Sequence, residues 1–225
     1  MGGDAVRDGV AAALVGGGFM GQVHAHALRA AGIPIVGVAS SSRASAEAAA
    51  ARLGIPRAYA DVDELLADEA VTLVHVLTPN ATHAALATAA LDAGRHVVCE
   101  KPLATTAADA TALASRASDA GLIAAVPFVY RFHPMVREVR ERALDGRLGK
   151  LALIHGSYLQ DWMLPRETAN WRVDPAAGGE SRAFADIGSH WIDLIEWVTG
   201  VQFVEAVGAT SILFDERPTR DGGSA

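Results

Sequence analysis

The sequence has few of the features that mark secreted or membrane-bound proteins. It contains one cysteine, Cys99, which cannot form an internal disulfide bond, so a reducing compartment is expected. No apolar run reaches the length of a transmembrane helix, and the first thirty residues lack the basic start and cleavage site of a signal peptide. We therefore expect a cytoplasmic protein that does not contact a membrane.

Basic residues are also scarce. The 19 Lys and Arg residues are outnumbered by 26 Asp and Glu residues, which gives a formal net charge of −7, and the basic residues occur only as scattered pairs. Such a sequence offers no electrostatic surface for a nucleic-acid backbone. The 225 residues, 51% of them hydrophobic, are enough for one large domain or two small ones. A small molecule is the expected partner.

In residues 1–127, short apolar runs rich in β-branched residues alternate with Ala-rich segments of helical length. This alternation is typical of βαβ units that build a parallel sheet. Gly32, Gly54 and Gly94 stand where helices should end, and Asp61 is suited to cap a helix start. Helices are expected to begin near residues 20, 43, 61, 81 and 105. The predicted strands span Val10–Val15, Ile35–Ala39, Arg57–Ala60, Thr72–Leu77, His96–Glu100 and Leu122–Pro127.

After Pro127 the pattern changes, and we expect a second domain over residues 128–225. The sequence predicts helices over Met135–Leu144 and Asp186–Thr199, and strands over Lys150–Gln160 and Phe203–Phe214. So few strands leave an open sheet edge that needs a partner or further sequence. The expected fold class is therefore α/β, with a doubly wound parallel sheet followed by an α+β domain that looks incomplete.

A glycine-rich motif connects the first predicted strand to the first predicted helix. Residues 16–21 read GGGFMG, which satisfies G-x-G-x-x-G at the strand-to-helix junction. Gly16 would permit the tight turn, Gly18 would let a pyrophosphate approach the backbone, and Gly21 would let the helix pack closely. The helix start would donate amide hydrogen bonds to the phosphates. The motif predicts dinucleotide binding in a Rossmann domain by Gly16, Gly18, Phe19, Met20 and Gly21.

The second predicted strand lacks the carboxylate that NAD enzymes usually offer to the ribose hydroxyls. Instead, Ala39 is followed by Ser40, Ser41, Ser42 and Arg43. Hydroxyl groups and a guanidinium group suit a 2′-phosphate, so NADP is the preferred cofactor and NAD remains possible. The alternative is that these serines only form a turn and cap the next helix, with Arg43 in solvent.

Polar residues also follow two later strands. Because the carboxyl ends of parallel strands share one edge of a sheet, the two loops should line the same crevice. At this edge Lys101 either reaches solvent by its aliphatic stem or is held near a ligand. The predicted cofactor-binding residues in these loops are Thr78, Pro79, Asn80 and His83, and then Glu100, Lys101 and Pro102.

In the second domain, Asp186, His190 and Asp193 form one polar stripe on a helix with an apolar opposite face. Such stripes are often merely solvated, but this one has aromatic and guanidinium neighbours that suit a sugar ring and its hydroxyls. Those neighbours are Trp162, Trp171 and Arg172. A metal site is not expected, because a single histidine and no nearby cysteine leave no third firm ligand. The histidines His24, His26 and His75 are interpreted as structural.

Together these residues resemble the Gfo/Idh/MocA family of glucose-fructose oxidoreductases and inositol dehydrogenases. The resemblance rests on GGGFMG, on the TPN loop with His83, on EKP at residues 100–102 and on DIGSHWID at residues 186–193. It implies that Lys101 is the active-site lysine, that His190 is the catalytic histidine and that Asp186 accompanies them. It also implies a cis peptide bond before Pro102.

The resemblance further implies an NAD(P)-dependent oxidoreductase that transfers hydride between a nicotinamide cofactor and a hydroxyl of a sugar, inositol or related polyol. Full-length relatives continue through a larger sheet that usually builds a dimer interface, so a homo-oligomer through the sheet of the second domain is expected if that sheet is complete. Two alternatives remain open: an NAD-recycling, glycosidase-like member, and a non-catalytic paralogue that only binds dinucleotide. The candidate substrate-binding residues are Tyr130, Arg131, Trp162, Trp171, Arg172, Asp186 and His190.

Overall fold

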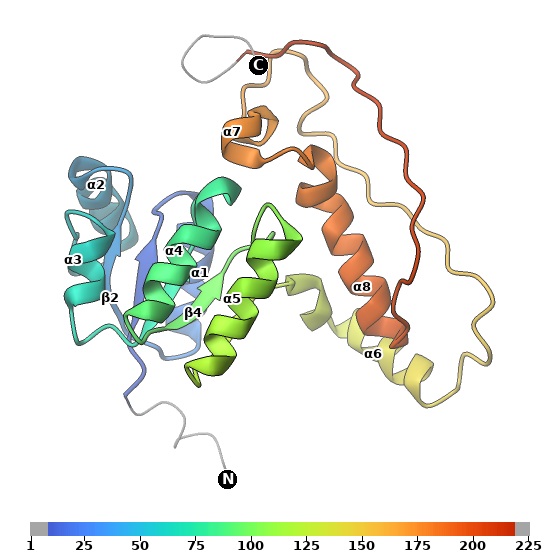
Figure 1. Cartoon of the computed structure of the whole chain (residues 1–225), viewed down its shortest axis with the longest axis horizontal. Coiled ribbons are helices and arrows are strands. Elements are labelled where there is room, and N and C mark those ends of the chain that lie inside the picture. Colours follow the sequence, from blue (N-terminus) through green and yellow to red (C-terminus); the bar gives the residue numbers. More distant parts are fainter. Residues whose placement is uncertain (1–8, 219–225) are drawn as a thin grey trace. The chain divides into compact units, whose positions relative to one another are not determined.

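The computed structural model describes residues 9–218. The chain divides into two units, the first ending at Pro127 and the second beginning at Phe128. The first unit is built around a parallel sheet, and the second consists of helices and long extended segments (Figure 1). Within residues 9–218, no helix combines the length and the apolar character needed to cross a membrane.

A five-stranded parallel sheet forms the centre of the first unit, in the order β2-β1-β3-β4-β5. The chain leaves β1 for β2 on one side and then returns to place β3 on the other side. The order of the strands therefore reverses between β1 and β3, which is where open α/β sheets bind ligands. The strands are β1 (Ala12–Val15), β2 (Ile35–Ala39), β3 (Leu73–Val76), β4 (His96–Cys99) and β5 (Ala124–Ala125).

The third predicted strand, Arg57–Ala60, is wrong as a strand. Ala58 forms only an isolated parallel bridge with Val38 of β2. The chain on either side explains why the pairing stops there: Pro56 has no amide to donate to a ladder, and Asp61 already caps the next helix. The other predicted strands form, although β5 has only two residues.

Five α-helices connect the strands, and each begins within two residues of its predicted start. Their ends carry the expected signals: Gly54 ends α2 with a φ of +61°, and the Asp61 side chain accepts a hydrogen bond from the Glu64 amide at 2.8 Å to cap α3. The helices are α1 (Phe19–Ala30), α2 (Arg43–Leu53), α3 (Val62–Ala67), α4 (His83–Asp92) and α5 (Ala107–Asp119), with a 3₁₀ turn η1 (Asn80–Thr82) before α4.

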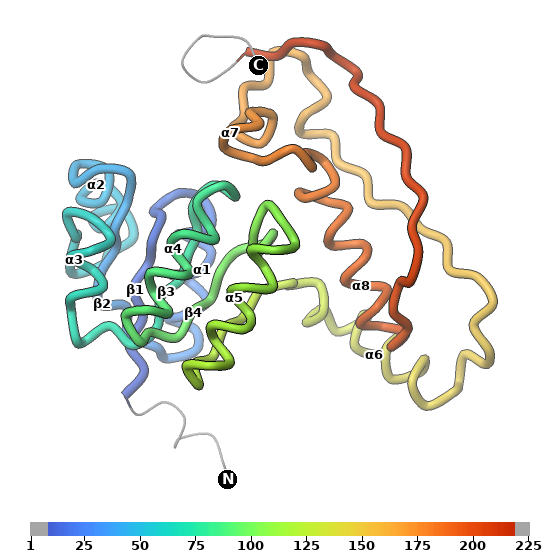
Figure 2. Tube along the Cα trace, viewed as in Figure 1, coloured from blue at the N-terminus to red at the C-terminus, as the bar shows by residue number. Residues whose placement is uncertain are grey.

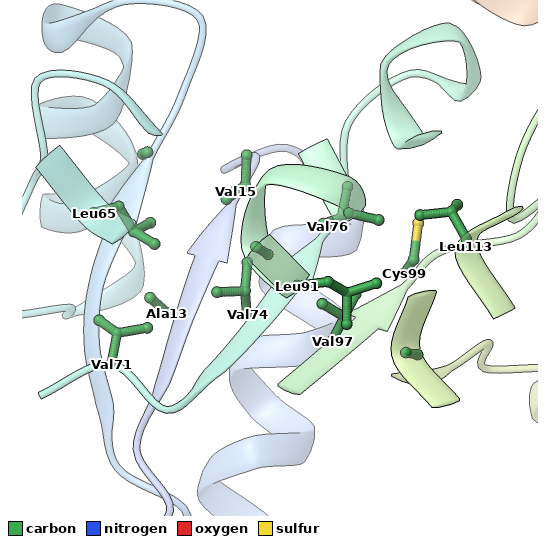
Figure 3. Close-up of a cluster of buried hydrophobic side chains, with 14 of the residues drawn as sticks. Ala13, Val15, Leu65, Val71, Val74, Val76, Leu91, Val97, Cys99 and Leu113 are labelled. Carbon is green, nitrogen blue, oxygen red and sulfur yellow. The ribbon is translucent and has the colours of Figure 1, made fainter. Parts of the chain in front are cut away.

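Both faces of the sheet are buried, which confirms the doubly wound arrangement. In β1, Ala12 and Leu14 pack against α1 and α2, whereas Ala13 and Val15 point to the opposite face. Figure 3 shows this second cluster, in which strand residues meet side chains of α3, α4 and α5. Cys99 belongs to it and is buried at the end of β4, as the sequence predicts.

The second unit contains the two predicted helices. Helix α6 spans Pro134–Leu144 and packs against α8 (Ser189–Thr199), but the predicted helix from Asp186 begins as a separate π-helical segment, η4 (Phe184–Gly188). Shorter elements are the 3₁₀ turns η2 (Val129–Phe132) and η3 (Trp171–Val173) and the helix α7 (Pro175–Gly178).

The two strands predicted in the second unit do not form. Residues 151–160 and 201–212 are extended, and Figure 2 shows them as long uncoiled stretches in pale orange and red, but they join no ladder in the described part of the chain. An apolar extended segment becomes a strand only when its amides and carbonyls pair with a neighbour. Without that pairing, Leu153, Leu159, Val204 and Val207 remain exposed.

Candidate functional site

The glycine motif after β1 is shaped by close backbone contacts. Gly16 has a φ of +110°, and a Cβ atom there would lie 2.9 Å from the Leu77 carbonyl oxygen. A Cβ atom at Gly21 would lie 2.7 Å from the Gly16 carbonyl oxygen. At Gly18, by contrast, no other atom of residues 9–218 lies within 4 Å of the Cβ position once its chain neighbours are set aside. The turn is therefore tightly packed at Gly16 and Gly21 and open at Gly18.

Gly17 also matters, and the sequence motif gave no reason to single it out. A Cβ atom at Gly17 would collide with Ala49 Cβ on α2. On the same helix, the Arg52 guanidinium donates a hydrogen bond to the Gly17 carbonyl. Helix α2 thus holds the middle of the glycine loop.

The start of α1 is suited to an anion. Its cap residue is Gly18, which has no side chain, and its first turn contains no acidic residue. Within the described residues no side chain caps α1, so the first-turn amides point toward the open side at Gly18. Phe19 beside them is 78% exposed. Helix start, open backbone and lack of negative charge together fit a pyrophosphate.

The serine-rich turn after β2 caps α2. The Ser42 hydroxyl accepts a hydrogen bond from the Ser45 amide at 3.2 Å, and the Ser45 hydroxyl accepts one from the Ser42 amide at 3.1 Å. Arg43 Nε donates to Glu47 Oε1 at 3.1 Å on the exposed surface of the helix. The capping alternative is therefore confirmed for Ser42, and the exposed side chain of Arg43 also agrees with it.

His83 connects the loops after β3 and β4. One ring nitrogen lies 2.7 Å from the Thr78 carbonyl oxygen and the other lies 2.7 Å from the Pro102 carbonyl oxygen. The side chain is only 1% exposed, so its contribution is to hold the two loops together. Pro79 and Asn80 begin the turn between Thr78 and His83. The Lys101–Pro102 peptide bond is cis, as the family resemblance implied.

Glu100 is buried and faces α1. Its Oε2 atom accepts a hydrogen bond from the Lys101 amide at 3.1 Å, and its Oε1 atom lies 3.1 Å from His24 Nε2. His24 Nδ1 in turn lies 2.8 Å from His75 Nδ1 on β3. Burial, and to a smaller extent the neighbouring His24, lowers the pKa of His75 from 6.5 to about 3. His75 is therefore neutral near pH 7. His26, the third histidine interpreted as structural, is exposed.

In the second unit, His190 lies in the first turn of α8 among aromatic rings. Its centroid is 4.8 Å from that of Tyr130, 5.9 Å from Phe128 and 6.1 Å from Tyr158. The two tyrosine hydroxyls are hydrogen-bonded to each other, and this bond and burial raise the pKa of Tyr130 to about 12. The sequence analysis missed Tyr158, because this residue belongs to no recognisable motif and its sequence neighbours do not mark it as part of a site.

Asp186 is held by Arg172. Arg172 Nε donates to Asp186 Oδ1 at 2.9 Å, and the same guanidinium lies 4.5 Å from the Trp171 ring and 5.4 Å from the Trp162 ring. Gly178 lets this arrangement form, because a Cβ atom there would lie 2.8 Å from the Arg172 carbonyl oxygen. The predicted contacts Trp162, Trp171 and Arg172 thus gather around Asp186.

Arg131 makes a bidentate contact with Asp193. Its Nε atom donates to Asp193 Oδ2 at 2.8 Å, and an Nη2 hydrogen bond reaches the other carboxylate oxygen. The hydrogen bond to Asp193 raises the pKa of Arg131 above its usual range. This pair connects η2 to α8, so Arg131 is engaged within the second unit.

The comparisons with known proteins agree with this geometry. Residues 10–128 match the model of an oxidoreductase family with an NAD-binding Rossmann fold, Gfo/Idh/MocA. The chain belongs to this family. Residues 136–225 match the Gfo/Idh/MocA C-terminal domain.

Among curated Gfo/Idh/MocA proteins, the chain is 34% identical over 221 residues to levoglucosan dehydrogenase of Pseudarthrobacter phenanthrenivorans, covering 94% of this chain and 56% of that protein. It is 36% identical over 153 residues to D-xylose 1-dehydrogenase (NADP⁺) 2 of Haloferax volcanii, covering 68% and 46%. The chain therefore spans about half the length of these relatives.

Solved structures share the fold. A levoglucosan dehydrogenase in complex with NADH and levoglucosan superposes with a TM-score of 0.86 at 30% identity, and covers 95% of this chain and 60% of that one. An oxidoreductase domain protein from Kribbella flavida gives a TM-score of 0.89 at 36% identity, with the same coverage.

We expect substitutions at Gly18 and Gly16 to have different effects, one mainly on cofactor binding and the other mainly on stability. Gly18→Ala adds a methyl group to open space, so the free energy of unfolding should change by less than about 1 kcal/mol, while NADPH affinity falls by about tenfold or more. Gly16→Ala should destabilise the fold itself, because of its positive φ and the Leu77 carbonyl. Urea unfolding and fluorescence titration measure the two effects. Unchanged NADPH affinity in Gly18→Ala would contradict the assignment.

His75 should make the fold sensitive to acid. Its pKa is about 3 in the fold against 6.5 ordinarily, so the unfolded chain binds the extra proton between these values. The stability from neutral His75 is complete above pH 6.5 and is lost as the pH falls toward 3. From about pH 6 to about pH 4, His75→Val should flatten the fall in unfolding free energy by up to about 1.4 kcal/mol per pH unit in urea titrations. The exposed His26→Val serves as the control, and an equal slope change there would contradict the prediction.

Proposed function

We propose that this chain binds a nicotinamide dinucleotide and takes part in hydride transfer with a hydroxyl group of a sugar or related polyol. The observation that carries the proposal is the open, uncapped start of α1 at Gly18, at the point where the strand order reverses. Membership of an NAD-binding oxidoreductase family supports it, as do relatives named for levoglucosan and D-xylose.

We propose NADP as the preferred cofactor. The Ser42 hydroxyl uses a lone pair to accept from Ser45, which leaves its proton available to a phosphate oxygen. Arg43 and the start of α2 add positive charge at the same edge. One relative is named for NADP⁺, whereas levoglucosan dehydrogenase was solved with NADH, so a direct comparison of the two cofactors is informative.

When bound, the nicotinamide ring supplies the hydride acceptor. We propose that His190 accepts the proton of the substrate hydroxyl and that Lys101 positions or polarises its oxygen. The rings of Phe128, Tyr130 and Tyr158 restrict the imidazole of His190. With its pKa raised to about 12, Tyr130 stays protonated near neutral pH and keeps its hydroxyl as a donor.

Asp186 would orient His190 or bind a second hydroxyl of the substrate. Arg172 holds this carboxylate through its Oδ1 atom at 2.9 Å. The tryptophans that stack on Arg172 hold the guanidinium in place, so a sugar would meet a preset carboxylate.

Replacing either proposed acid-base residue should remove most of the turnover. Lys101→Met and His190→Asn should each lower kcat by about a hundredfold or more in NADPH formation with levoglucosan, D-xylose or myo-inositol. The exposed Lys150→Met and His26→Asn are matched controls and should keep wild-type turnover. If both residues serve one step, the double variant should lose little more than either single variant. Near-normal turnover in both single variants would contradict the roles.

The same assay, repeated with a simple aryl glycoside as an additional substrate, separates the alternatives. Net NADPH formation identifies a dehydrogenase, whereas release of sugar from the glycoside without net cofactor change would identify an NAD-recycling glycosidase. Cofactor affinity without any turnover would identify a dinucleotide-binding protein.

Arg43 should determine the choice between the two cofactors. Arg43→Ala removes a charge-assisted contact to the 2′-phosphate, so NADPH affinity should fall by about tenfold while NADH affinity stays within about twofold. Glu47→Ala is the matched control: it frees the Arg43 guanidinium from its surface ion pair and should not weaken NADPH binding. Equal losses for NADPH and NADH in Arg43→Ala, measured by fluorescence titration, would contradict the NADP assignment.

A further inference from the structure

Three buried polar side chains form a continuous chain beneath the Lys101 loop. His24 lies on α1, His75 on β3 and Glu100 just after β4, and each is 7% exposed. The Nδ1 atoms of the two histidines are 2.8 Å apart, and His24 Nε2 is 3.1 Å from Glu100 Oε1. The other oxygen of Glu100 accepts the Lys101 amide at 3.1 Å. A path of hydrogen bonds therefore runs from the middle of the sheet to the backbone of Lys101.

With both imidazoles neutral, the contacts assign each proton to one nitrogen. The Glu100 carboxylate accepts, so His24 must donate from Nε2, and its Nδ1 atom is then an acceptor. His75 must therefore donate from Nδ1. Its Nε2 atom is left as a bare lone pair, and this atom is buried without a hydrogen-bond partner among residues 9–218. A neutral imidazole has one donor and one acceptor, so this assignment gives each contact along the chain one donor and one acceptor.

We propose that His24 and His75 are positioning residues for Lys101. His75 fixes the tautomer of His24, His24 holds the Glu100 carboxylate, and Glu100 holds the Lys101 amide. The inference rests on the catalytic role proposed above for Lys101.

A second contact meets the same loop from the other side. His83 lies 2.7 Å from the Pro102 carbonyl oxygen, one residue beyond Lys101. The Lys101 amide is thus hydrogen-bonded to Glu100, which His24 of α1 contacts, and the next carbonyl along the chain lies within hydrogen-bond distance of His83 on α4. An apolar contact would pack this layer equally well, but it would not fix the rotation of the Glu100 carboxylate. This difference makes the inference testable.

The test uses two replacements of His75. The amide group introduced by His75→Asn would offer a side-chain N–H close to the position of Nδ1, whereas His75→Val would fill the buried strand position without a donor. A third variant, His24→Gln, keeps a donor toward Glu100 without an imidazole. Thermal unfolding followed by circular dichroism, together with NADPH titration, shows that each variant is folded and binds cofactor.

The first measurement is NMR of the ¹⁵N-labelled chain, which does not depend on activity. Long-range ¹H–¹⁵N spectra of the wild type should show His24 protonated at Nε2 and His75 protonated at Nδ1. The Lys101 amide signal should be shifted from its wild-type position in His75→Val. In His75→Asn and His24→Gln it should lie closer to the wild-type position than in His75→Val. The opposite tautomers in the wild type, or an unmoved Lys101 amide in folded His75→Val, would overturn the proposal.

The second measurement is turnover. His75→Val should lower kcat by about tenfold with NADPH affinity and substrate KM within about twofold, because the loop is misplaced while the binding groups remain. His75→Asn should recover most of kcat. Equal loss in both variants would show a structural role and overturn the inference. If the wild type has no turnover with any sugar, the proposed function fails, and the NMR result still decides whether the chain of hydrogen bonds holds the Lys101 backbone.

Discussion

Parallel pairing of β1 with β2 on one side and β3 on the other brings the loops that we propose bind the cofactor to one edge of the sheet. Parallel strands that share a register end at the same level, so the loops after them emerge together. The glycine turn follows β1, the serine turn follows β2, and the loops that contain Thr78 and Lys101 follow β3 and β4. Residues that lie far apart in the sequence become neighbours through backbone hydrogen bonds alone.

Much of this arrangement follows from local patterns. The glycine motif at a strand-to-helix junction and the EKP sequence after a buried strand could be placed from the sequence, since each depends on a single element and its end. The contacts among His24, His75 and Glu100 could not, because they join residues 51 and 76 positions apart on three different elements. The sequence suggests a structural role for each histidine but does not show which partner it contacts.

The errors have a related cause. Arg57–Ala60 and residues 150–160 have the composition of strands, but a strand also requires a neighbour with a compatible register. At Arg57–Ala60 the flanking Pro56 and Asp61 leave room for one bridge. In the second unit, side chains expected to face a sugar are engaged with nearby carboxylates, Arg131 with Asp193 and Arg172 with Asp186. An arginine in a motif indicates that an anion will be bound, but not whether that anion belongs to the protein.

The hydrogen bond from Arg52 to the Gly17 carbonyl makes α2 a strut between two parts of the cofactor site. The first turn of this helix carries Arg43, which we propose contacts the 2′-phosphate, and its last turn holds the loop that we propose contacts the pyrophosphate. Because a helix moves as one rigid element, a shift at one of its ends would also move the other end. Binding of one half of a dinucleotide would then change the affinity for the other half. Adenosine 2′,5′-bisphosphate and nicotinamide mononucleotide, supplied as separate fragments, would then bind with a coupling energy that their joint affinity reveals.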